Sequence, residues 1–534
     1  MPQHEPRERR PLVVIAEPVS PATVPALGEG VEVRHVDGTD RPSLLAAVAD
    51  ASALVVRSAT RVDADLLAAA PRLRVVARAG TGLSNVDVRA ATVAGVMVVT
   101  APQANPVSAA ELTVGLMIAA ARHVVPAHRS LQEGSWERSA FTGTELHGKT
   151  LGVLGLGRVG QLVADRMRAF GMQVLAHDPY VQPGRAAQRG VRLVDLDTLL
   201  TESDVLTVHL PRTPQTRGLV DHCALTRVKP SLVLVNAARG GIVDEQALAD
   251  ALREGRVAAA AVDVFDHEPA TGSPLLGLDR VVATPHLGAS TAEAQEKAGV
   301  AVARSVVAAL AGEVVPDAVN VQGGSMPEAV RPAVPLVERL GRLFSHVAGE
   351  LAAALDVEVR GELADLDVRI LELAALKGAF GDVVDEAVTY VNVPALAAER
   401  GTACRLVTDR ECPDHRNLIT LRGTLADGCE ISVGASLSER GRSRLVEVMG
   451  YAVDLALGEH LVLLVHTDKP GAVGVVGGLL GDAGVNIAGM QVSRHDVGGD
   501  VLVALDLDGP LPPGTLDLVV EAVGASWARS VTLP

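Results

Sequence analysis

Short apolar runs separated by longer amphipathic segments dominate the first part of the chain. Between residues 11 and 101, the runs PLVVIAE, ALVVRS, LRVVARAG and GVMVVT alternate with Ala- and Leu-rich segments of helical character. Short Val-rich runs of this kind are typical of strands buried on both faces of a parallel sheet. We therefore expect residues 11–101 to form an α/β unit.

The same alternation returns between residues 149 and 286, and a long helix is expected on either side of it. Ser108-Ala-Ala-Glu111 and Ser290-Thr-Ala-Glu293 match the S-x-x-E capping box, which predicts that a helix begins at each. The first of these helices is expected over 108–131. This order indicates that the first α/β unit is interrupted by a second one, with a long helix at each crossing.

The carboxyl-terminal part of the chain has a different pattern. Pro327, Pro332 and Pro335 lie in a stretch without strand character, which we interpret as a linker. Mixed α/β patterns follow over 336–457, with the strand-like runs LDVEVRG and EISVGASL. Residues 460–534 then read strand, helix, strand, strand, helix, strand, which predicts a small βαββαβ module.

Composition restricts the partners and the compartment. The 534 residues, 48% of them hydrophobic, suffice for about three or four domains with sizeable cores. The net charge of −16 argues against nucleic acid and anionic membranes as partners. Four scattered cysteines lack metal-ligand spacing, so free thiols and no metal site are expected. We find neither a signal peptide nor an 18-residue apolar span, and therefore expect a cytoplasmic protein.

The most informative stretch is TLGVLGLGRVG, at residues 150–160. An apolar run leads into Gly155-x-Gly157-x-x-Gly160, an amphipathic segment follows, and a second apolar run ends at Asp178. This is the order of a dinucleotide-binding βαβ unit, in which the glycines permit a tight turn, approach of a pyrophosphate and close helix packing. Asp178 suits the adenosine ribose hydroxyls and would repel a 2′-phosphate, so NAD is expected rather than NADP. The alternative is an ordinary Gly-rich turn.

Three polar residues follow apolar runs further along this region. They are Arg239 in LVNAARGGIVDE, Glu268 in AVDVFDHEP and His286 in VVATPHLGAS. Open α/β sheets bind ligands at the carboxyl ends of their strands. An imidazole can take a hydroxyl proton, a carboxylate can orient that imidazole, and a guanidinium can bind a substrate carboxylate. The set suits oxidation of a 2-hydroxy acid, although each residue alone is also common in turns or at solvated surfaces.

Longer motifs between residues 11 and 318 carry a family resemblance. They are VRSATRV (56–62), RAGTGLSNVDV (78–88), NPVSAAEL (105–112), LGVLGLGRVG (151–160), HDPY (177–180), TVHLPRTPQTRGLV (207–220), LVNAARGGIVDEQAL (234–248), AVDVFDHEP (261–269) and TPHLGASTAEAQ (284–295). These motifs resemble the D-isomer-specific 2-hydroxyacid dehydrogenases. The resemblance implies that Arg239, Glu268 and His286 are catalytic. It further implies NAD-dependent oxidation of D-3-phosphoglycerate to 3-phosphohydroxypyruvate, the first step of phosphorylated L-serine biosynthesis.

The resemblance also assigns positions that contact the substrate. Those positions are Arg57, Ser58, Arg78, Gly80 and Asn105. Arg57 and Asn105 match substrate-binding positions of the family, backbone near Gly80 would bind the carboxylate, and Arg78 is a natural cation for a phosphate ester. Arg138, in SWERSAFTGTEL, is expected either to reach the site of a neighbouring subunit or to be a solvated charge at a helix end.

A further set of positions is expected around the cofactor. It consists of Gly155, Gly157, Arg158, Val159, Gly160, Asp178, His209, Pro211, Thr216, Ala237 and Asp263. Backbone N–H groups of Arg158 and Val159 would bind the pyrophosphate, while the loop from His209 to Thr216 resembles the adenosine side of the family's site. Ala237 would lie near the nicotinamide. Asp263 would hold the carboxamide, or alternatively cap a turn.

The last 75 residues resemble an ACT domain, a regulatory module of amino-acid metabolism, over VHTDKPGAVGVVGGLLGDAGVNIAGMQVSR. The resemblance implies an allosteric L-serine site at an interface between two such modules, formed by His466, Asp468 and Asn486. The alternative is that DKPG is only a turn. The preceding region resembles the intervening domain of the family's long members. Its GYAVDLA (450–456) has alanines where some relatives have basic side chains, so a second substrate site is not expected.

These patterns together predict two Rossmann-like, doubly wound α/β domains, one inserted in the other, then an α+β intervening domain and a βαββαβ ACT domain. The expected boundaries are 1–102 with 287–318 for substrate binding, 103–286 for NAD binding, 319–457 for the intervening domain and 458–534 for the ACT domain. A homo-oligomer is expected, specifically a homotetramer built as a dimer of dimers.

Three alternatives stay open from the sequence. The chain could be another D-2-hydroxyacid dehydrogenase, or could also reduce 2-oxoglutarate. It could instead be a non-catalytic, NAD-sensing protein of the corepressor type, because corepressors are built on this fold. Finally, the last 200 residues could serve assembly alone.

Overall fold

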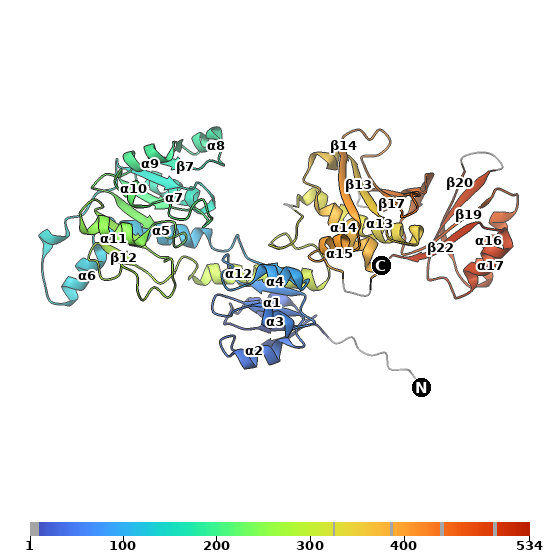
Figure 1. The fold of residues 1–534 in the computed structure, drawn as a ribbon, viewed down its shortest axis with the longest axis horizontal. Helices are drawn as coiled ribbons and strands as arrows, with labels where there is room; N and C mark the ends of the chain where they lie inside the picture. The colour runs from blue at the N-terminus through green and yellow to red at the C-terminus, as the bar shows by residue number, and fades with distance from the viewer. Residues whose placement is uncertain (1–9, 324–325, 385–387, 438–442, 495–498, 534) are drawn as a thin grey trace.

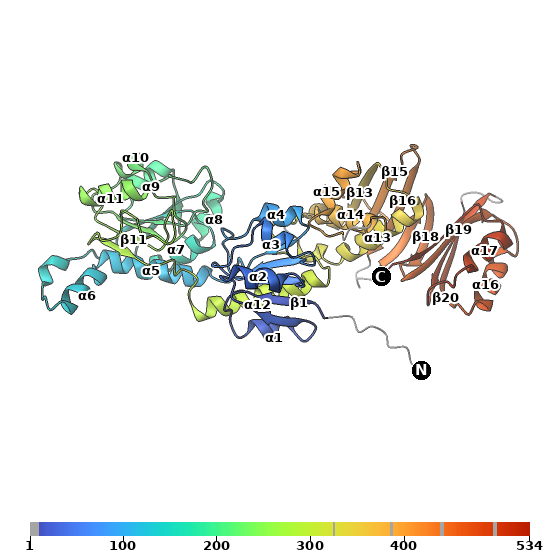
Figure 2. The ribbon, with the colours of Figure 1, turned by 60° about the horizontal axis from the view of Figure 1, so that its bottom comes forward.

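In a computed structural model, the described residues form four β-sheets that follow one another from the amino to the carboxyl terminus (Figure 1). The structure describes residues 10–323, 326–384, 388–437, 443–494 and 499–533, so residues 1–9, in which no signal peptide is expected, lie outside the described residues. Figures 1 and 2 show an elongated molecule. The lobe that contains β6–β12 lies at one end and the sheet β19–β22 at the other, with the lobe that contains β1–β5 between them.

The first lobe holds the predicted parallel sheet, and its strands lie in the order β2-β1-β3-β4-β5. Its strands are β1 (Leu12–Ile15), β2 (Glu32–His35), β3 (Ala53–Val56), β4 (Val75–Arg78) and β5 (Met97–Val99). Its short helices are α1 (Thr23–Leu27), α2 (Arg41–Val48), α3 (Ala64–Ala68) and α4 (Val88–Val93). Every residue of β1 and β3 is buried, which explains their apolar runs. β2 was not predicted, because it is an edge strand with mostly exposed side chains.

The second lobe holds a parallel sheet of order β12-β11-β10-β9-β6-β7-β8. Its strands are β6 (Thr150–Leu154), β7 (Gln173–His177), β8 (Arg192–Leu193), β9 (Val205–Val208), β10 (Val233–Asn236), β11 (Ala259–Val262) and β12 (Val281–Ala283). Its helices are α7 (Arg158–Ala169), α8 (Pro183–Gln188), α9 (Leu196–Glu202), α10 (His222–Leu225) and α11 (Glu245–Arg253). β6 lies between β7 and β9, so the strand order reverses there, and such a reversal opens a ligand crevice at the carboxyl ends.

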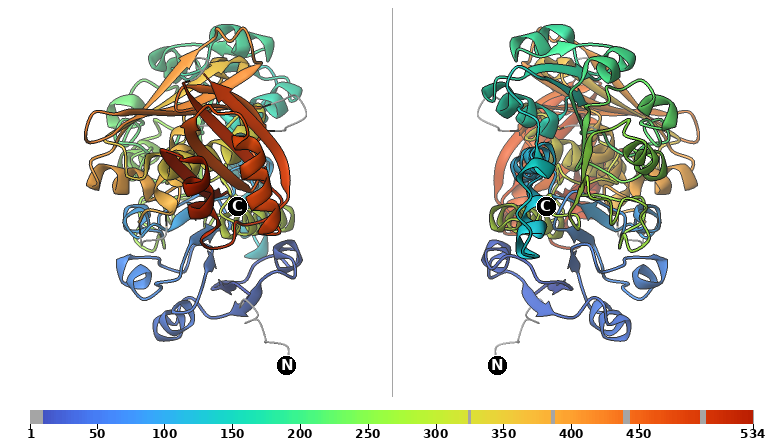
Figure 3. Two further views of the ribbon diagram at one scale, coloured as in Figure 1. Left: turned by 90° about the vertical axis from the view of Figure 1, so that its right-hand side faces the viewer. Right: turned by 90° about the vertical axis from the view of Figure 1, so that its left-hand side faces the viewer.

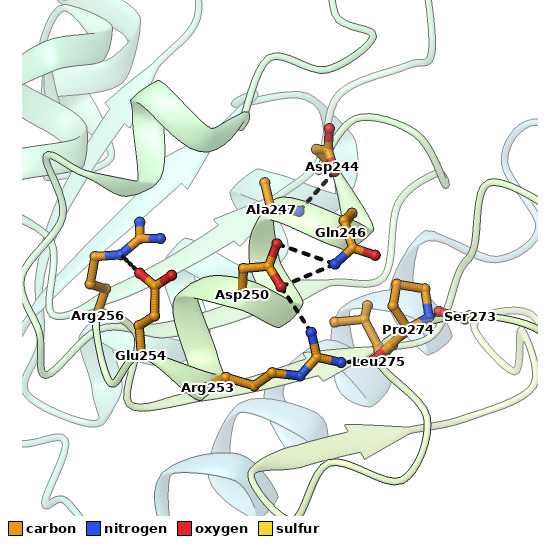
Figure 4. Close-up of polar contacts among 10 residues, drawn as sticks. All are labelled: Asp244, Gln246, Ala247, Asp250, Arg253, Glu254, Arg256, Ser273, Pro274 and Leu275. Atoms are coloured by element: carbon orange, nitrogen blue, oxygen red, sulfur yellow. Dashed lines mark hydrogen bonds and ion pairs between the residues drawn. The ribbon is translucent and has the colours of Figure 1, made fainter.

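Hydrogen bonds of side chains cap α11 and connect its last turn to the segment that follows β11 (Figure 4). Asp244 caps the helix by accepting a hydrogen bond from the backbone N–H of Ala247, at 2.9 Å. At the other end, Arg253 donates to Asp250 and to the carbonyl of Pro274. The segment after β11 therefore has a fixed support.

Two crossings join the lobes, and both predicted helix starts need correction. α5 (Pro106–Ala121) begins two residues before Ser108, so Ser108 is part of the helix and not its cap. Its hydroxyl lies 2.8 Å from the hydroxyl of Thr291. A proline is tolerated at the first helical position because that N–H would be unpaired anyway. α12 (Ala292–Leu310) is capped by Thr291, which accepts from the N–H of Ala294, one residue later than predicted.

The helix predicted over 108–131 is in fact two helices. His123, with φ of 51°, separates α5 from α6 (Val124–Gln132), and η1 (Arg138–Phe141) follows. Within the described ranges, no single helix is both long and apolar enough to cross a membrane. α5 and α6 satisfy that criterion only as a pair, across a bend of 63°.

The third unit is a mixed sheet of order β14-β13-β15-β16-β17-β18, packed on α13 and α14. Its elements are η2 (Glu328–Val330), α13 (Ala333–Ala348), β13 (Ala354–Gly361), η3 (Glu362–Asp365), α14 (Ile370–Gly381), α15 (Val393–Glu399), β14 (Ala403–Asp409), β15 (Asn417–Thr424), β16 (Glu430–Leu437), β17 (Ser443–Val448) and β18 (Tyr451–Ala456). The linker predicted from the prolines is partly wrong, because Pro332 and Pro335 lie at the start of α13. Proline is readily accommodated in a first helical turn.

The last unit is an antiparallel sheet of order β20-β21-β19-β22, with the predicted βαββαβ sequence of elements. They are β19 (His460–Thr467), α16 (Ala472–Asp482), β20 (Ile487–Arg494), β21 (Asp500–Leu507), α17 (Thr515–Val523) and β22 (Trp527–Thr532). The two helices pack side by side on one face, seen in red in the left view of Figure 3. Side chains of the other face, including Leu461 and Leu463, join the core around α13.

Candidate active site

The three glycines of the second lobe adopt the geometry expected of a phosphate cradle. Gly155, directly after β6, has φ of 97°, which favours glycine. A Cβ at Gly160 would lie under 3.0 Å from the carbonyl oxygen of Gly155, so α7 packs closely on the turn. A Cβ at Gly157 would meet nothing within 4 Å. The turn is therefore open toward the N-terminus of α7, whose unpaired N–H groups and positive dipole end suit an anion.

Asp178 lies directly after β7 and contacts the same turn. Its carboxylate accepts hydrogen bonds from the N–H of Leu156, at 2.9 Å, and of Tyr180, at 3.0 Å. These bonds hold the carboxylate beside the glycine turn while leaving lone pairs for further donors. Its contact with ribose hydroxyls stays a prediction.

The loop after β9 is internally bonded. Thr207 and the Nε2 atom of His209 are 2.9 Å apart, and burial lowers the pKa of His209 to about 4, so its ring is neutral near pH 7. Thr216 donates from its hydroxyl to the carbonyl of Pro211 at 2.6 Å, which closes the loop. His209 also lies against the turn, because a Cβ on Gly155 would meet its backbone. The loop is thus next to the cradle, as the cofactor prediction requires.

Arg239 follows β10 in a loop fixed by a residue that the sequence analysis missed. The buried side chain of Asn236 accepts from the N–H of Ala238, at 3.2 Å, and donates to the carbonyl of Arg239, at 3.1 Å. The Nη1 atom of Arg239 donates to the carbonyl of Ala238. Ala237, expected near the nicotinamide, is part of the same loop. An amide directly after an apolar run was the available signal for Asn236.

His286 and Glu268 are brought together from two different strand ends. The Nδ1 atom of His286 is 2.8 Å from Oε2 of Glu268, whose other oxygen accepts from the N–H of Phe265 at 3.1 Å. Both side chains are accessible, at 46% and 38% exposure. Because Nδ1 is engaged by the carboxylate, Nε2 is the ring nitrogen that remains for a substrate.

Asp263 determines the shape of the loop that carries His286. Its buried carboxylate accepts three hydrogen bonds, from the Thr284 hydroxyl at 2.6 Å and from the N–H groups of Leu287 and Gly288 at 2.7 and 2.9 Å. These bonds flank His286, which has φ of 56°, an uncommon value for a non-glycine residue. The turn-capping alternative is therefore realised, and a contact with the carboxamide stays a prediction.

The first lobe contributes cations to the other side of the site. Burial lowers the pKa of Arg78, and the positive charges of Arg239 and Arg57 lower it further, so cations of both lobes influence this guanidinium group. Arg78 also lies against Gly80, since a Cβ there would come within 3.0 Å of its Nη1 atom. A small recess beside Arg57 is lined by Val19, Ser20, Arg57, Ala79 and Gln295.

The other two substrate positions are placed at loop ends. Ser58 is exposed directly after Arg57, and Asn105 occupies the N-cap position of α5, in the connection between the lobes. Arg138, by contrast, lies in η1 and is exposed. It follows α6, which projects from the end of the second lobe that faces away from the first lobe in Figures 1 and 2. Among the described residues of one chain, no hydrogen bond or ion pair joins Arg138 to the other substrate residues.

The three predicted effector residues do not form one cluster within a chain. Asp468 pairs with Arg494, the last residue of β20, at 3.2 Å. Asn486 directly precedes β20 and bonds to Asp508. At about 3.3 Å per residue, the length of β20 separates the two by about 25 Å. His466 is buried at the Asp468 end, with its Nδ1 atom 2.8 Å from the carbonyl of Thr467.

Comparisons with known proteins decide the family. The NAD binding domain of the D-isomer specific 2-hydroxyacid dehydrogenases matches residues 114–288, and the D-3-phosphoglycerate dehydrogenase intervening domain matches residues 329–449. The D-3-phosphoglycerate dehydrogenase of Mycobacterium leprae is 53% identical over 525 residues, which cover 98% of this chain and 99% of that protein. The chain belongs to the D-3-phosphoglycerate dehydrogenase family. These matches confirm the predicted family, the fold class, the NAD cofactor and the oxidoreductase class.

More distant relatives agree. The D-3-phosphoglycerate dehydrogenase of Archaeoglobus fulgidus is 41% identical over 527 residues, which cover 98% of this chain and all of that protein. The crystal structure of a glyoxylate reductase from Paecilomyes thermophila is 31% identical with a TM-score of 0.53, and the match covers 58% of this chain and 98% of that one. The shared architecture thus extends beyond one substrate, and the substrate must be argued from the site.

Proposed function

We propose that this protein oxidises D-3-phosphoglycerate to 3-phosphohydroxypyruvate with NAD, the first step of phosphorylated L-serine biosynthesis, in the cytoplasm. The observation that carries the proposal is the His286–Glu268 pair, 2.8 Å apart at the carboxyl ends of the second sheet. Besides burial, the positive charges of Arg239 and Arg57 lower the pKa of Arg78, which supports an anion site shared by the two lobes. The full-length identity to proteins of this activity supports the same reaction.

The reaction removes a hydride from C2 of the substrate and a proton from its hydroxyl. The Nε2 atom of His286 accepts that proton, and Glu268 stabilises the imidazolium that forms. Arg239 binds the substrate carboxylate and polarises the carbonyl as it develops. When bound, NAD supplies the nicotinamide that accepts the hydride. The open cradle at Gly157 and the N-terminus of α7 fit its pyrophosphate.

The phosphate ester explains why several cations are gathered in the first lobe. Arg78 is partly buried, and its Nε atom has no hydrogen-bond partner among the described residues. A bound phosphate would compensate the charges of Arg78 and Arg57, whereas an unphosphorylated acid would leave the Nε atom of Arg78 unpaired. Leaving buried polar groups unpaired is a strong basis for discrimination between substrates. Other D-2-hydroxy acids, and 2-oxoglutarate in the reverse direction, are the rival substrates.

A non-catalytic NAD sensor is the rival of a different class. The test compares wild type with His286→Ala in two assays, NADH formation from D-3-phosphoglycerate and calorimetric binding of NAD. We expect the variant to bind NAD as wild type does while its turnover falls by about 10²-fold or more. If the variant kept both the turnover and the biological role of the protein, the catalytic proposal would be wrong.

For the quaternary structure, the proposal is a homotetramer built as a dimer of dimers from two separate surfaces. One is the arm around α6, on which Val124, Val125, Leu131 and Trp136 are exposed. An exposed apolar group of this kind is typical of an interface. The other is the edge strand β20. Two different two-fold contacts generate a closed tetramer. Light scattering of wild type and Trp136→Ala tests the first surface, with loss of the tetramer expected.

The serine site is proposed to lie between two ACT modules. Antiparallel pairing of β20 with its copy would place Asn486 of one chain beside Asp468 of the other, although about 25 Å separates them within one chain. This arrangement explains why the effector residues lie at opposite ends of β20. Calorimetry with L-serine, using Asp468→Ala as the control, separates regulation from assembly.

The proposed domain boundaries stay as the sequence predicts them, at 1–102 with 287–318, 103–286, 319–457 and 458–534. Each of the four sheets lies within one of these parts, which supports the division.

A further inference from the structure

Residues 57–60 form the loop that directly follows β3 and carries Arg57 and Ser58. The carboxylate of Glu17 binds the backbone N–H groups of this loop. Glu17 lies just beyond β1, forty residues earlier in the chain. Its Oε1 atom accepts hydrogen bonds from the N–H groups of Arg57, at 2.8 Å, and Thr60, at 2.9 Å. Its Oε2 atom accepts from the N–H of Ala59 at 3.1 Å. One carboxylate thus binds three of the four N–H groups in residues 57–60.

Asn85 holds the same loop from the opposite side. Its Nδ2 atom donates to the carbonyl oxygens of Arg57, at 2.9 Å, and Thr60, at 2.6 Å. The amide orientation is fixed by these partners, because a flipped amide would place its oxygen against two carbonyls. The N–H of Val62 also donates to the carbonyl of Asn85. The loop is therefore held by an acceptor on its N–H groups and by a donor on its carbonyls.

Glu17 also carries a negative charge that acts on the guanidinium group of Arg78. Burial raises the pKa of the Glu17 carboxyl, but the hydrogen bonds from Thr60, Arg57 and Ala59 outweigh burial, so the net pKa is lowered and the group is ionised near pH 7. Its negative charge raises the pKa of Arg78, against the effects of burial and of Arg239. A carboxylate placed here offsets part of the repulsion between neighbouring guanidinium groups when no substrate is bound.

We propose that Glu17 and Asn85 are positioning residues for substrate recognition, which act by fixing residues 57–60 so that Arg57 and Ser58 are presented to the phosphorylated acid. The inference rests on the proposed function for the identity of that acid. It assigns no chemical step to either residue. Pre-formed loops raise affinity because less ordering is needed on binding. The expected consequence of loosening the loop is a loss of substrate affinity, with the cofactor side of the site unchanged.

The test uses Glu17→Gln, Glu17→Ala and Asn85→Ala in the full-length protein. The control is Asp87→Asn, because Asp87 lies in the same lobe and accepts one backbone N–H, that of Ala90, as the cap of α4. Steady-state kinetics give kcat and KM for the acid and for NAD separately. We expect KM for the acid to rise about tenfold in the two alanine variants and less in Glu17→Gln, which keeps one acceptor oxygen. KM for NAD should stay unchanged in all variants.

The substrate for these assays is the acid that wild type oxidises best in a panel, so the inference is tested even if that acid is not D-3-phosphoglycerate. If that acid is a different one, the proposed function is wrong, and the positioning role is still decided by the KM values of the variants for that acid. Equal KM values for the acid in the alanine variants and Asp87→Asn would overturn the inference. So would a parallel loss of kcat, NAD affinity and melting temperature, because that pattern indicates general damage to the lobe.

Discussion

Gly160→Ala gives a sharp test of the cofactor cradle. The added Cβ would lie under 3.0 Å from the carbonyl oxygen of Gly155, a separation that Cβ atoms do not show in proteins. Because a normal C···O contact is about 3.3 Å or longer, α7 must move away from the turn by an appreciable fraction of an ångström. The N-terminus of α7 is where the pyrophosphate is expected, so the move acts directly on NAD binding.

The two energetic effects can be weighed. Overpacking typically costs about 1–3 kcal/mol, while replacing a helical glycine by alanine gains about 1 kcal/mol, so stability should fall only slightly. A hydrogen bond to a charged group contributes about 1.5–3 kcal/mol, so losing one weakens NAD binding by about 10- to 100-fold. The effect on affinity should therefore exceed the effect on stability.

The assay is calorimetric titration with NAD, together with thermal melting. The matched control is Gly115→Ala in α5. Gly115 is helical like Gly160, but it is exposed and its Cβ would meet nothing within 4 Å. The control should bind NAD normally and melt at the same or a higher temperature. Equal NAD affinity of Gly160→Ala and Gly115→Ala would refute the assignment of the cradle.

Three further predictions follow from the site. Glu268→Gln should lower kcat by on the order of 10²-fold without changing the calorimetric affinity for NAD, because it removes the negative charge that stabilises the imidazolium of His286. Asp263→Asn should leave a buried N–H near His286 unpaired, costing about 1–3 kcal/mol and several degrees of melting temperature in scanning calorimetry. Glu17 has a lowered folded pKa, so its stabilisation is present above its ordinary pKa of 4.5 and is lost as the pH falls through the folded value. Urea unfolding should therefore separate wild type from Glu17→Gln at pH 7 and no longer in strong acid.

The sequence predicted those features that depend on local pattern. Buried strands such as β3 and β6 have apolar runs, and the spacing of Gly155, Gly157 and Gly160 requires a tight turn followed by a helix. The order of strands and helices was sufficient to predict two parallel sheets and a βαββαβ module. The strand ends that carry Glu268 and His286 were predictable for the same reason, since polar residues after buried strands lie at one edge of the sheet.

The sequence predicted poorly where the local hydrophobic pattern is weak, or where contacts with distant residues determine the structure. β2 was missed because its exposed edge has no apolar run, and the helix predicted to begin at Ser108 begins at Pro106, since a proline is tolerated at the first helical position. The role of Glu17 depends on backbone groups forty or more residues away, and no periodicity reports such contacts. The length of β20 keeps Asp468 and Asn486 apart within one chain, and their expected meeting between two modules stays a prediction.

The most direct test of the account is the initial rate of NADH formation with D-3-phosphoglycerate, D-lactate, D-glycerate and D-2-hydroxyglutarate. The gathered cations of the first lobe predict a clear preference in kcat/KM for the phosphorylated acid. Arg57→Ala and Arg78→Ala should reduce that preference more than they reduce activity on D-glycerate. Strong activity on an unphosphorylated acid alone would contradict the substrate assignment, although the dehydrogenase family would stand.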